Sequence, residues 1–276
     1  MNKKLLVIFH VWYKDQVDYF IAKLANINNC EWDLWVTMSY QDNSVIEKLR
    51  NYNPDTRFIT APNVGYDIAP FVEIIRHQDI SKYDYILKLH TKRYVNEDVR
   101  FNSVNVKGWV WRDLLVDALL GTKEKFLIAL NKLGQDDVGM VCSYELYKYR
   151  GRLFPEDTCM LEAEAERIGV QIRSNKFCAG SIFIVKTIAL RKIIEAEIGV
   201  ESWGGAMSAS WGTPAHVYER LLCLVVTDAG YKIRCSCATV ALSIQAFIYK
   251  SAYGLFLKLI YRPLKYIKTK YFSRNK

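Results

Sequence analysis

Three polar residues in a row, His90, Thr91 and Lys92, follow the apolar, alternating segment Tyr83–Leu89. Such a segment predicts a buried strand. Ligands of open α/β sheets bind beyond the carboxyl ends of the strands, so we expect these residues to belong to a binding site. An imidazole and an ammonium can offer hydrogen bonds and positive charge to an anionic ligand. Lys88 stands two residues before His90 and should share its face of the strand.

A second candidate group precedes that strand, in the segment NVGYDIAPF. Gly65 can adopt a positive φ angle, and the short polar side chains of Asn63 and Asp67 can bond local backbone, which predicts a turn. Apolar residues then recur at helical spacing from Ile68 to Arg76. Asp67 therefore either contacts the ligand or only caps this helix.

A third group lies on a helix predicted to begin near Pro214, because proline favours the first helical position. His216 and Glu219 are three residues apart and so share one face of that helix. A carboxylate in this setting can act as general base toward a hydroxyl group. The alternative is that Glu219 only pairs with Arg220 or another cation.

Strands and helices alternate over the first ninety residues, which is typical of a parallel sheet with right-handed crossovers. The first strand ends at His10, which adds this histidine to the candidate site. Ser44 is expected to cap the second helix. The expected elements are a strand at 3–11, a helix at 16–27, a strand at 32–39, a helix at 44–50 and a strand at 57–62.

The second half continues the α/β pattern, with two long loops. Residues 93–108, which begin with Arg93, lack a pattern and are expected to form a flexible flap over the site. Gly180, inside a strong strand prediction at 178–186, indicates either a close approach or only a bulge. The other expected elements are helices at 109–120, 123–133, 155–168 and 187–198, strands at 138–143 and 231–235, and a loop at 201–213.

Length and composition favour one α/β domain, residues 1–235, followed by a tail, residues 236–276. With 276 residues, 51% of them hydrophobic, the chain can bury a large core. No signal peptide is expected, because two lysines precede a short apolar run without a cleavage site. Seven cysteines without a CxxC pair indicate free thiols in a reducing compartment.

The positive charge is concentrated in the tail. The formal net charge is +9, yet ten Lys and Arg and no Asp or Glu follow Asp228. The longest uncharged run there, Cys235–Tyr249, is fifteen residues, shorter than the ~20 of a spanning helix. Basic residues mixed with aromatic ones favour an amphipathic helix lying on an anionic membrane surface. A solvated tail and a nucleic-acid partner are the alternatives, and the rest of the chain carries no basic excess for nucleic acid.

Six segments together resemble the rhamnan synthesis protein F family: NVGYDIAPF, YDYILKLHTKR, DLLVDALLG, DVGMV, CAGSIFIVK and PAHVYERLL. The resemblance runs from Lys4 to Arg234. It implies a GT-A-like glycosyltransferase fold and a nucleotide-sugar donor such as dTDP-rhamnose. It also implies a lipid-linked glycan acceptor and a cytoplasmic, peripheral place on the inner face of a bacterial plasma membrane. Tyr66 departs from the expected NxGRDI, where a basic residue would stand.

The resemblance gives the candidate residues roles. Donor binding would fall to His10, Asn63, Gly65, Asp67, Lys88, His90, Lys92 and Arg93, catalysis to Glu219 and His216, and a place in the acceptor pocket to Gly180. Related enzymes usually present two aspartates for a divalent metal where this chain has His90 and Lys92. We therefore expect an inverting, metal-independent enzyme without a Mg²⁺ or Mn²⁺ site, in which Lys92 stabilises the leaving diphosphate. The alternative is a non-catalytic carbohydrate-binding or assembly subunit of a polysaccharide synthesis complex.

Overall fold

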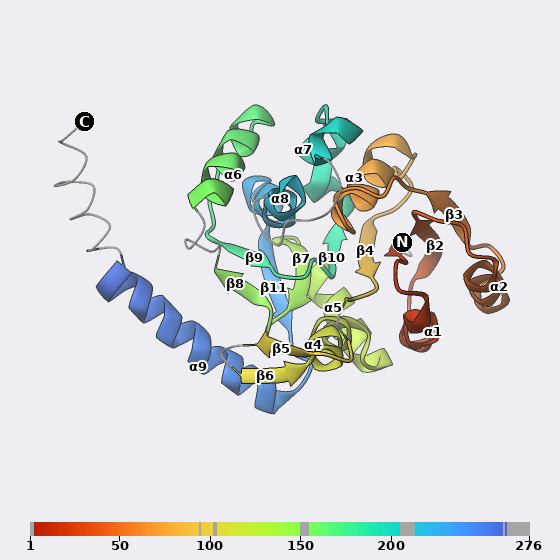
Figure 1. Ribbon diagram of the computed structural model, residues 1–276, viewed down its shortest axis with the longest axis horizontal. Coiled ribbons are helices and arrows are strands. Elements are labelled where there is room, and N and C mark those ends of the chain that lie inside the picture. Colours follow the sequence, from red (N-terminus) through yellow and green to blue (C-terminus); the bar gives the residue numbers. More distant parts are fainter. Residues whose placement is uncertain are drawn as a thin grey trace.

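A seven-stranded sheet forms the centre of the protein (Figure 1). The computed structural model describes residues 3–93, 95–101, 104–149, 155–204, 213–261 and 263, so parts of both predicted loops and most of the last fifteen residues lie outside it. In spatial order the strands are β11 (Lys232–Ser236), β7 (Val138–Ser143), β10 (Phe183–Lys186), β4 (Tyr85–His90), β1 (Lys4–His10), β2 (Glu31–Met38) and β3 (Arg57–Thr60).

The sheet is mostly parallel, which confirms the predicted fold class. β1 pairs in parallel with β2 and β4, β2 with β3, and β7 with β11. Only β10 is antiparallel to its two neighbours, β4 and β7. From β1 the chain adds β2 and β3 on one side and then places β4 on the other side of β1. The strand order thus reverses between β1 and β4, and open α/β sheets bind ligands at such a point.

Two apolar layers cover the sheet, because successive strand residues point to opposite faces. Leu6 and Ile8 of β1 pack with one group of helices, whereas Leu5 and Val7 pack with the other. The first group, in the upper part of Figure 1, is α3 (Ile68–His77), α6 (Pro155–Arg167), α7 (Arg191–Glu195) and α8 (Pro214–Asp228). The second is α1 (Val17–Leu24), α2 (Asn43–Tyr52), α4 (Gly108–Leu120) and α5 (Lys123–Leu133).

Several predicted boundaries need correction. Asp42, not Ser44, caps α2, because its Oδ1 accepts from the backbone N–H groups of Ser44 at 3.0 Å and Val45 at 3.2 Å. The strand expected at 178–186 is two strands, β9 (Lys176–Cys178) and β10. Gly180 and Ser181 separate them with φ angles of 86° and 48°, which extended backbone does not allow.

The expected flap also has more structure than its sequence indicated. Its described part forms an antiparallel ribbon of β5 (Asp98–Phe101) and β6 (Val104–Lys107). A second small ribbon pairs β8 (Tyr147–Tyr149) with β9. Both ribbons lie outside the central sheet, near its carboxyl edge, as Figure 1 shows.

The tail begins with one long helix, α9 (Val240–Phe256), which continues as a π-helical turn, Leu257–Tyr261. From Val240 to Ile260 it has 21 residues with a mean hydropathy of 1.3, so by length and composition it is able to cross a bilayer. The expectation that the apolar segment is too short to span was therefore wrong. Lys250 and Lys258 interrupt the uncharged run without ending the helix.

Candidate functional site

A cleft of about 710 Å³ opens at the carboxyl ends of β1 and β4. Residues from several distant segments of the chain line it: His10, Trp12, Tyr13, Ser39, Asn63, Tyr66, Asp67, Ile68, His90, Thr91, Lys92, Arg93, Trp111, Gly180, Ser181, Ala215, His216 and Glu219. Nine of the eleven predicted site residues are among them; Gly65 and Lys88 are not. A larger hollow of about 920 Å³ lies at the opposite, amino ends of the strands and contains none of them.

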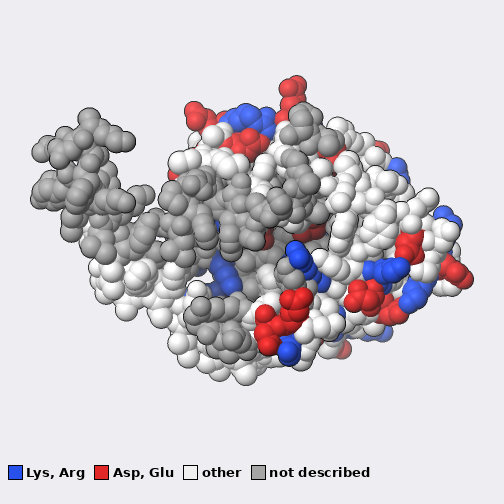
Figure 2. Space-filling view, viewed as in Figure 1, with Lys and Arg blue, Asp and Glu red and all other residues white. Residues whose placement is uncertain are grey.

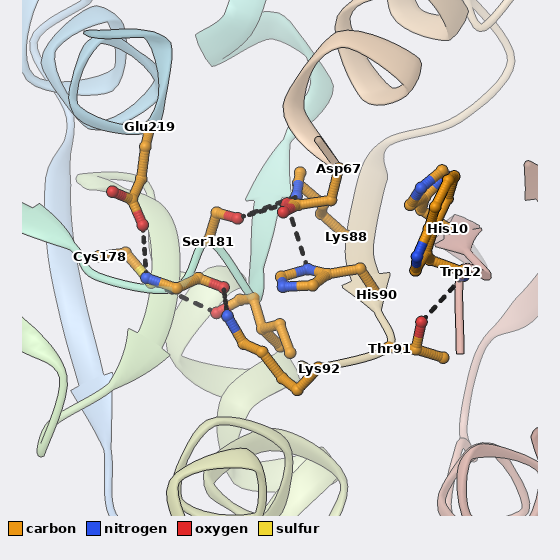
Figure 3. Close-up of polar contacts among 12 residues, drawn as sticks. His10, Trp12, Asp67, Lys88, His90, Thr91, Lys92, Cys178, Ser181 and Glu219 are labelled. Carbon is orange, nitrogen blue, oxygen red and sulfur yellow. Dashed lines mark hydrogen bonds and ion pairs between the residues drawn. The ribbon is translucent and has the colours of Figure 1, made fainter. Parts of the chain in front are cut away.

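Asp67 is the centre of the polar contacts (Figure 3). Its Oδ2 accepts from the ammonium of Lys88 and, at 2.7 Å, from the hydroxyl of Ser181. Nδ1 of His90 lies 3.2 Å from the same oxygen. The side chain makes no capping hydrogen bond to α3, so capping is excluded as its role. Burial alone would raise the pKa of Asp67, but the neighbouring imidazole of His90 and the ammonium groups of Lys88 and Lys92 outweigh burial and hold that pKa well below its usual range.

Lys88 lies beneath the cleft. Its side chain is 1% exposed, and its Nζ is 3.0 Å from Ser181 Oγ in addition to its ion pair with Asp67. The ring of Phe71 covers it, with the centroid 5.6 Å from Nζ. A lysine on an internal strand is tolerated because a carboxylate and a hydroxyl satisfy it. Lys88 therefore positions Asp67, and its charge is engaged inside the protein.

Two neutral histidines lie side by side, because His10 of β1 is the register partner of His90 of β4. Burial lowers the pKa of His10 to about 4, and its Nδ1 is 3.0 Å from Thr37 Oγ1. Burial likewise lowers the pKa of His90 well below its usual value, against the opposing charge of Asp67. Within the described part of the chain, neither ring nitrogen of His90 has a hydrogen-bond partner of good geometry.

Lys92 lies on the cleft wall, held by its backbone. The buried amide of Gln16 donates to Lys92 O at 2.7 Å and accepts from Lys92 N at 3.2 Å. Its Nζ stands 4.8 Å from the centroid of the Trp111 ring and 3.4 Å from Gly180 O. Burial lowers the pKa of Lys92, while Asp67 and Glu219 oppose this shift.

Thr91 ties the two strand ends together. Its Oγ1 accepts from the backbone N–H groups of Trp12, at 2.9 Å, and Tyr13, at 3.0 Å, and its own N–H donates to His10 O at 3.1 Å. Sequence reasoning placed Thr91 in the site as the middle residue of the polar triplet but gave it no specific role. It did not place Gln16 or Trp111 in the site.

The turn between β9 and β10 brings a backbone amide to Glu219. Gly180 N donates to Glu219 Oε1 at 2.6 Å. A Cβ atom on Gly180 would lie 2.8 Å from Leu115 Cδ1 and 3.1 Å from Lys92 Nζ, so Gly180 permits a close approach and is not merely a bulge. Ser181 beside it has a φ of 48°, a conformation that costs a non-glycine residue free energy and is typical of functional sites.

His216 and Glu219 both face the cleft from the first turns of α8, as their spacing predicted. His216 Nδ1 is 2.7 Å from Thr213 Oγ1, and its ring lies 5.9 Å from that of Tyr66. Arg220 points elsewhere: it is 4% exposed, donates to His216 O at 2.5 Å and stacks over Phe177. Glu219 is therefore engaged by Gly180, and the expected alternative of a simple pair with Arg220 is not what the structure has.

Gly65 supports the site from behind. Its φ is 62°, and its carbonyl accepts the N–H groups of Ile68 and Ala69, both at 3.1 Å. A Cβ atom there would lie 2.6 Å from Ala69 Cβ and 3.0 Å from Trp203 Cε3. Gly65 thus shapes the turn that delivers Asp67.

The donor atoms of the cleft suit an anion better than a metal ion. Within the described ranges, no group of three or more His, Cys, Asp or Glu side chains is arranged to hold a metal. The accepting oxygen of Asp67 is already bonded to Lys88 and Ser181. A divalent cation in the cleft would also meet the repulsion of the Lys92 ammonium.

The comparison with protein families identifies one family for this chain. The family model described as rhamnan synthesis protein F matches residues 1–231. Two curated relatives, both called uncharacterized protein WxcX, come from Xanthomonas campestris pv. campestris. The one from strain B100 is 26% identical over 235 residues and the one from strain ATCC 33913 is 25% identical over 241. Each match covers 82% of this chain and 32% of the relative, so the chain spans about a third of the relatives' length.

Among solved structures, the chain is similar to Staphylococcus aureus TarS 1-349. The identity is 13% and the TM-score 0.45, over 86% of this chain and 58% of that TarS fragment. The complex of the same TarS fragment with UDP gives a TM-score of 0.44 over the same shares.

Proposed function

Because this chain belongs to the rhamnan synthesis protein F family, we propose that it is a glycosyltransferase with a GT-A-like fold, acting in cell-surface glycan synthesis. One observation carries the proposal: a lysine and a carboxylate meet the same residue from two sides. Lys92 Nζ is 3.4 Å from Gly180 O, and Glu219 Oε1 is 2.6 Å from Gly180 N. A cleft that offers a cation and a base this close together suits a reaction that releases an anion while deprotonating a hydroxyl.

The cation would serve the leaving group. Transfer from a nucleotide-sugar releases a nucleoside diphosphate, so negative charge grows on a phosphate oxygen in the transition state. Among the described residues Lys92 makes no ion pair within 4 Å, whereas Lys88 is bound to Asp67. Lys92 is therefore the first candidate to bind the diphosphate, followed by Arg93, which lines the same cleft.

Glu219 would serve the acceptor. The amide of Gly180 engages Oε1, which fixes the carboxylate and leaves Oε2 to accept a proton from an acceptor hydroxyl. Direct attack by that hydroxyl on the anomeric carbon gives inversion. His216, one turn earlier on α8, faces the same space and would hold the acceptor in place.

The finer assignments are part of the proposal. Transfer is expected to be metal-independent, since Lys92 supplies the charge that a metal would supply. The family description names rhamnan, which supports rhamnose as the sugar. We propose dTDP-rhamnose as the donor and a lipid-linked glycan as the acceptor. The histidines beside Asp67 would line the donor end of the cleft, where burial keeps both imidazoles neutral against the opposing charge of Asp67.

The test is a binding and transfer experiment on the purified chain. Calorimetry against dTDP-rhamnose and a panel of other nucleotide-sugars should find one donor that binds, and Lys92→Ala should bind it weakly. Lys123→Ala, which removes an exposed lysine from α5, is the matched control and should bind normally. Failure of every nucleotide-sugar to bind would refute the proposal. Tight donor binding without transfer to any lipid-linked glycan would favour the non-catalytic subunit, which the lack of an aspartate pair at the end of β4 also allows.

A further inference from the structure

The side of α9 that faces away from the domain is apolar. Ile244, Ile248, Leu255 and Leu259 are spaced by four, seven and four residues, so they form one stripe along the helix. They are 56%, 61%, 58% and 61% exposed, and Phe247 beside them is 60% exposed. Figure 2 shows this region, at the lower left, as a surface without charged side chains. A surface helix of a soluble protein normally has the opposite arrangement.

The side of α9 that faces the domain carries the polar contacts. Lys250 is the only charged residue between Val240 and Leu257, and its ammonium donates to Tyr144 O and lies 3.8 Å from the centroid of the Tyr144 ring. Ser243 Oγ is 3.3 Å from Glu145 Oε1, and Ala246 between these two contacts is fully buried. The helix is thus fixed to the domain while its apolar stripe points outward.

We propose that α9 docks the protein on an anionic lipid bilayer, lying in the plane of the membrane with this stripe among the acyl chains. An exposed apolar stripe of this length requires a partner. The sequence from Lys258 to Lys276 has seven Lys and Arg and no Asp or Glu, which fits anionic headgroups next to the stripe. A second copy of the chain fits less well, because α9 and the segment after it contain no Asp or Glu to pair with the basic segment of another copy.

An in-plane position follows from the contacts with the domain. Val240–Ile260 is 21 residues long, which corresponds to about 32 Å of helix and would reach across a bilayer. However, Ser243, Lys250 and Tyr253, whose ring lies 5.9 Å from that of Tyr149, hold three turns of the helix against the domain. A spanning position would break these contacts and place Lys250 in the hydrocarbon centre, where a charge is costly.

The sheet topology places the start of α9 and the cleft at the same edge of the sheet. β11 is parallel to β7, and β10 is antiparallel to both β7 and β4, so β11 and β4 end at the same edge of the sheet. Ser236, at the end of β11, is three strand spacings from His90, or about 14 Å. α9 leaves from this edge. If the proposed function is correct, docking through α9 presents the cleft to a lipid-linked acceptor.

Vesicle binding tests the stripe with a matched control. Ile248→Asp with Leu255→Asp places two charges on it, whereas Ile128→Asp with Ile188→Asp places two charges at apolar positions that are 50% and 58% exposed elsewhere. With vesicles of phosphatidylethanolamine and phosphatidylglycerol, the parent and the control should cosediment. The stripe variant should bind about a hundredfold more weakly, about tenfold for each apolar side chain lost. Equal binding by the stripe variant, with unchanged circular dichroism, would overturn the proposal.

Two further outcomes would also overturn it. Parent protein that stays with vesicles after alkaline carbonate extraction would span the bilayer rather than lie in its plane. Parent protein that ignores vesicles but forms dimers in the ultracentrifuge, which the stripe variant does not form, would use the stripe for a second copy. The vesicle assay needs neither donor nor acceptor. A chain that binds vesicles but transfers no sugar would therefore contradict the proposed function and leave the proposal of membrane docking through α9 unaffected.

Discussion

Lys88 binds Asp67 beneath the cleft, although the two residues are 21 positions apart in the chain. The pair neutralises itself, and Ser181 Oγ completes it at 2.7 Å from Asp67 Oδ2 and 3.0 Å from Lys88 Nζ. Consequently the charge of Lys88 is engaged inside the protein, and Lys92 presents its charge to the cleft. Two lysines four residues apart thus have different roles, one structural and one in the cleft.

Replacing Lys88 by Met should destabilise the protein, because it leaves the Asp67 carboxylate buried without its cation. Breaking one partner of such a pair costs about 3–5 kcal/mol. Lys88→Met with Asp67→Asn removes both charges and should recover most of that loss. Urea unfolding of the three proteins measures the difference. A Lys88→Met variant as stable as the parent would show that the pair contributes nothing.

Some of this arrangement was predictable from sequence and some was not. The alternation of Tyr83–Leu89 placed His90, Thr91 and Lys92 at a strand end, because period and burial are local properties. The same alternation put Lys88 on the face of His90 but could not show that Asp67 would cover it. That contact depends on how the turn at Gly65 folds back over β4.

Contacts between distant segments were also missed. The amide of Gln16 that holds the Lys92 backbone comes from a short turn before α1, and no motif marks it. The strand predicted at 178–186 is split into β9 and β10 because Gly180 and Ser181 take positive φ angles, which the residue type of Ser181 does not reveal. The apolar helix α9 is longer than the uncharged run of fifteen residues suggested, because the helix continues through Lys250.

The two buried histidines should make the protein sensitive to mild acid. His10 has a pKa of about 4 in the folded protein, and that of His90 is also lowered. An unfolded chain protonates both near pH 6.5, so between about pH 6.5 and 4 the unfolded state binds more protons and stability falls as pH falls. For His10 the loss is about 3 kcal/mol.

Urea unfolding at about pH 7 and about pH 4.5 measures this loss. His10→Gln should show a smaller drop between the two pH values than the parent. His77→Gln is the control, because His77 is 57% exposed and lies outside the pair of buried histidines. Identical drops in His10→Gln and the parent would contradict the assignment.

Gly180→Ala should impair the site more than the fold. The φ of 86° strains any side chain, and the new Cβ would press on Leu115 Cδ1 at 2.8 Å and Lys92 Nζ at 3.1 Å. Gly230→Ala is a matched control, since Gly230 has the same φ of 86° but nothing within 4 Å of a Cβ. Both variants should lose about 1–2 kcal/mol of stability from strain. Only Gly180→Ala should also lose donor affinity by calorimetry; equal affinity in the two would mean that the approach to Lys92 is irrelevant.

Glu219→Gln keeps an oxygen for the Gly180 amide and removes the basic carboxylate. Transfer should fall by ~10²–10⁴-fold while donor affinity is retained, because only proton removal from the acceptor is affected. Glu162→Gln, on an exposed face of α6, should transfer at the parent rate. Single-turnover assays with saturating donor measure the step directly. Parent-like rates in Glu219→Gln would assign the carboxylate a structural role.

Lys92→Ala should separate side-chain catalysis from metal catalysis. The cleft offers an ammonium and neutral imidazoles where Mg²⁺ or Mn²⁺ would require oxygen ligands. The diphosphate then loses its charge-assisted contact in Lys92→Ala, so both donor affinity and turnover should fall by tenfold or more, about 1.5–3 kcal/mol. Chelation by EDTA should leave the parent rate unchanged, because the charge comes from the chain itself. If EDTA instead abolished transfer and Mn²⁺ restored it, a metal would be supplying the charge that this arrangement assigns to Lys92.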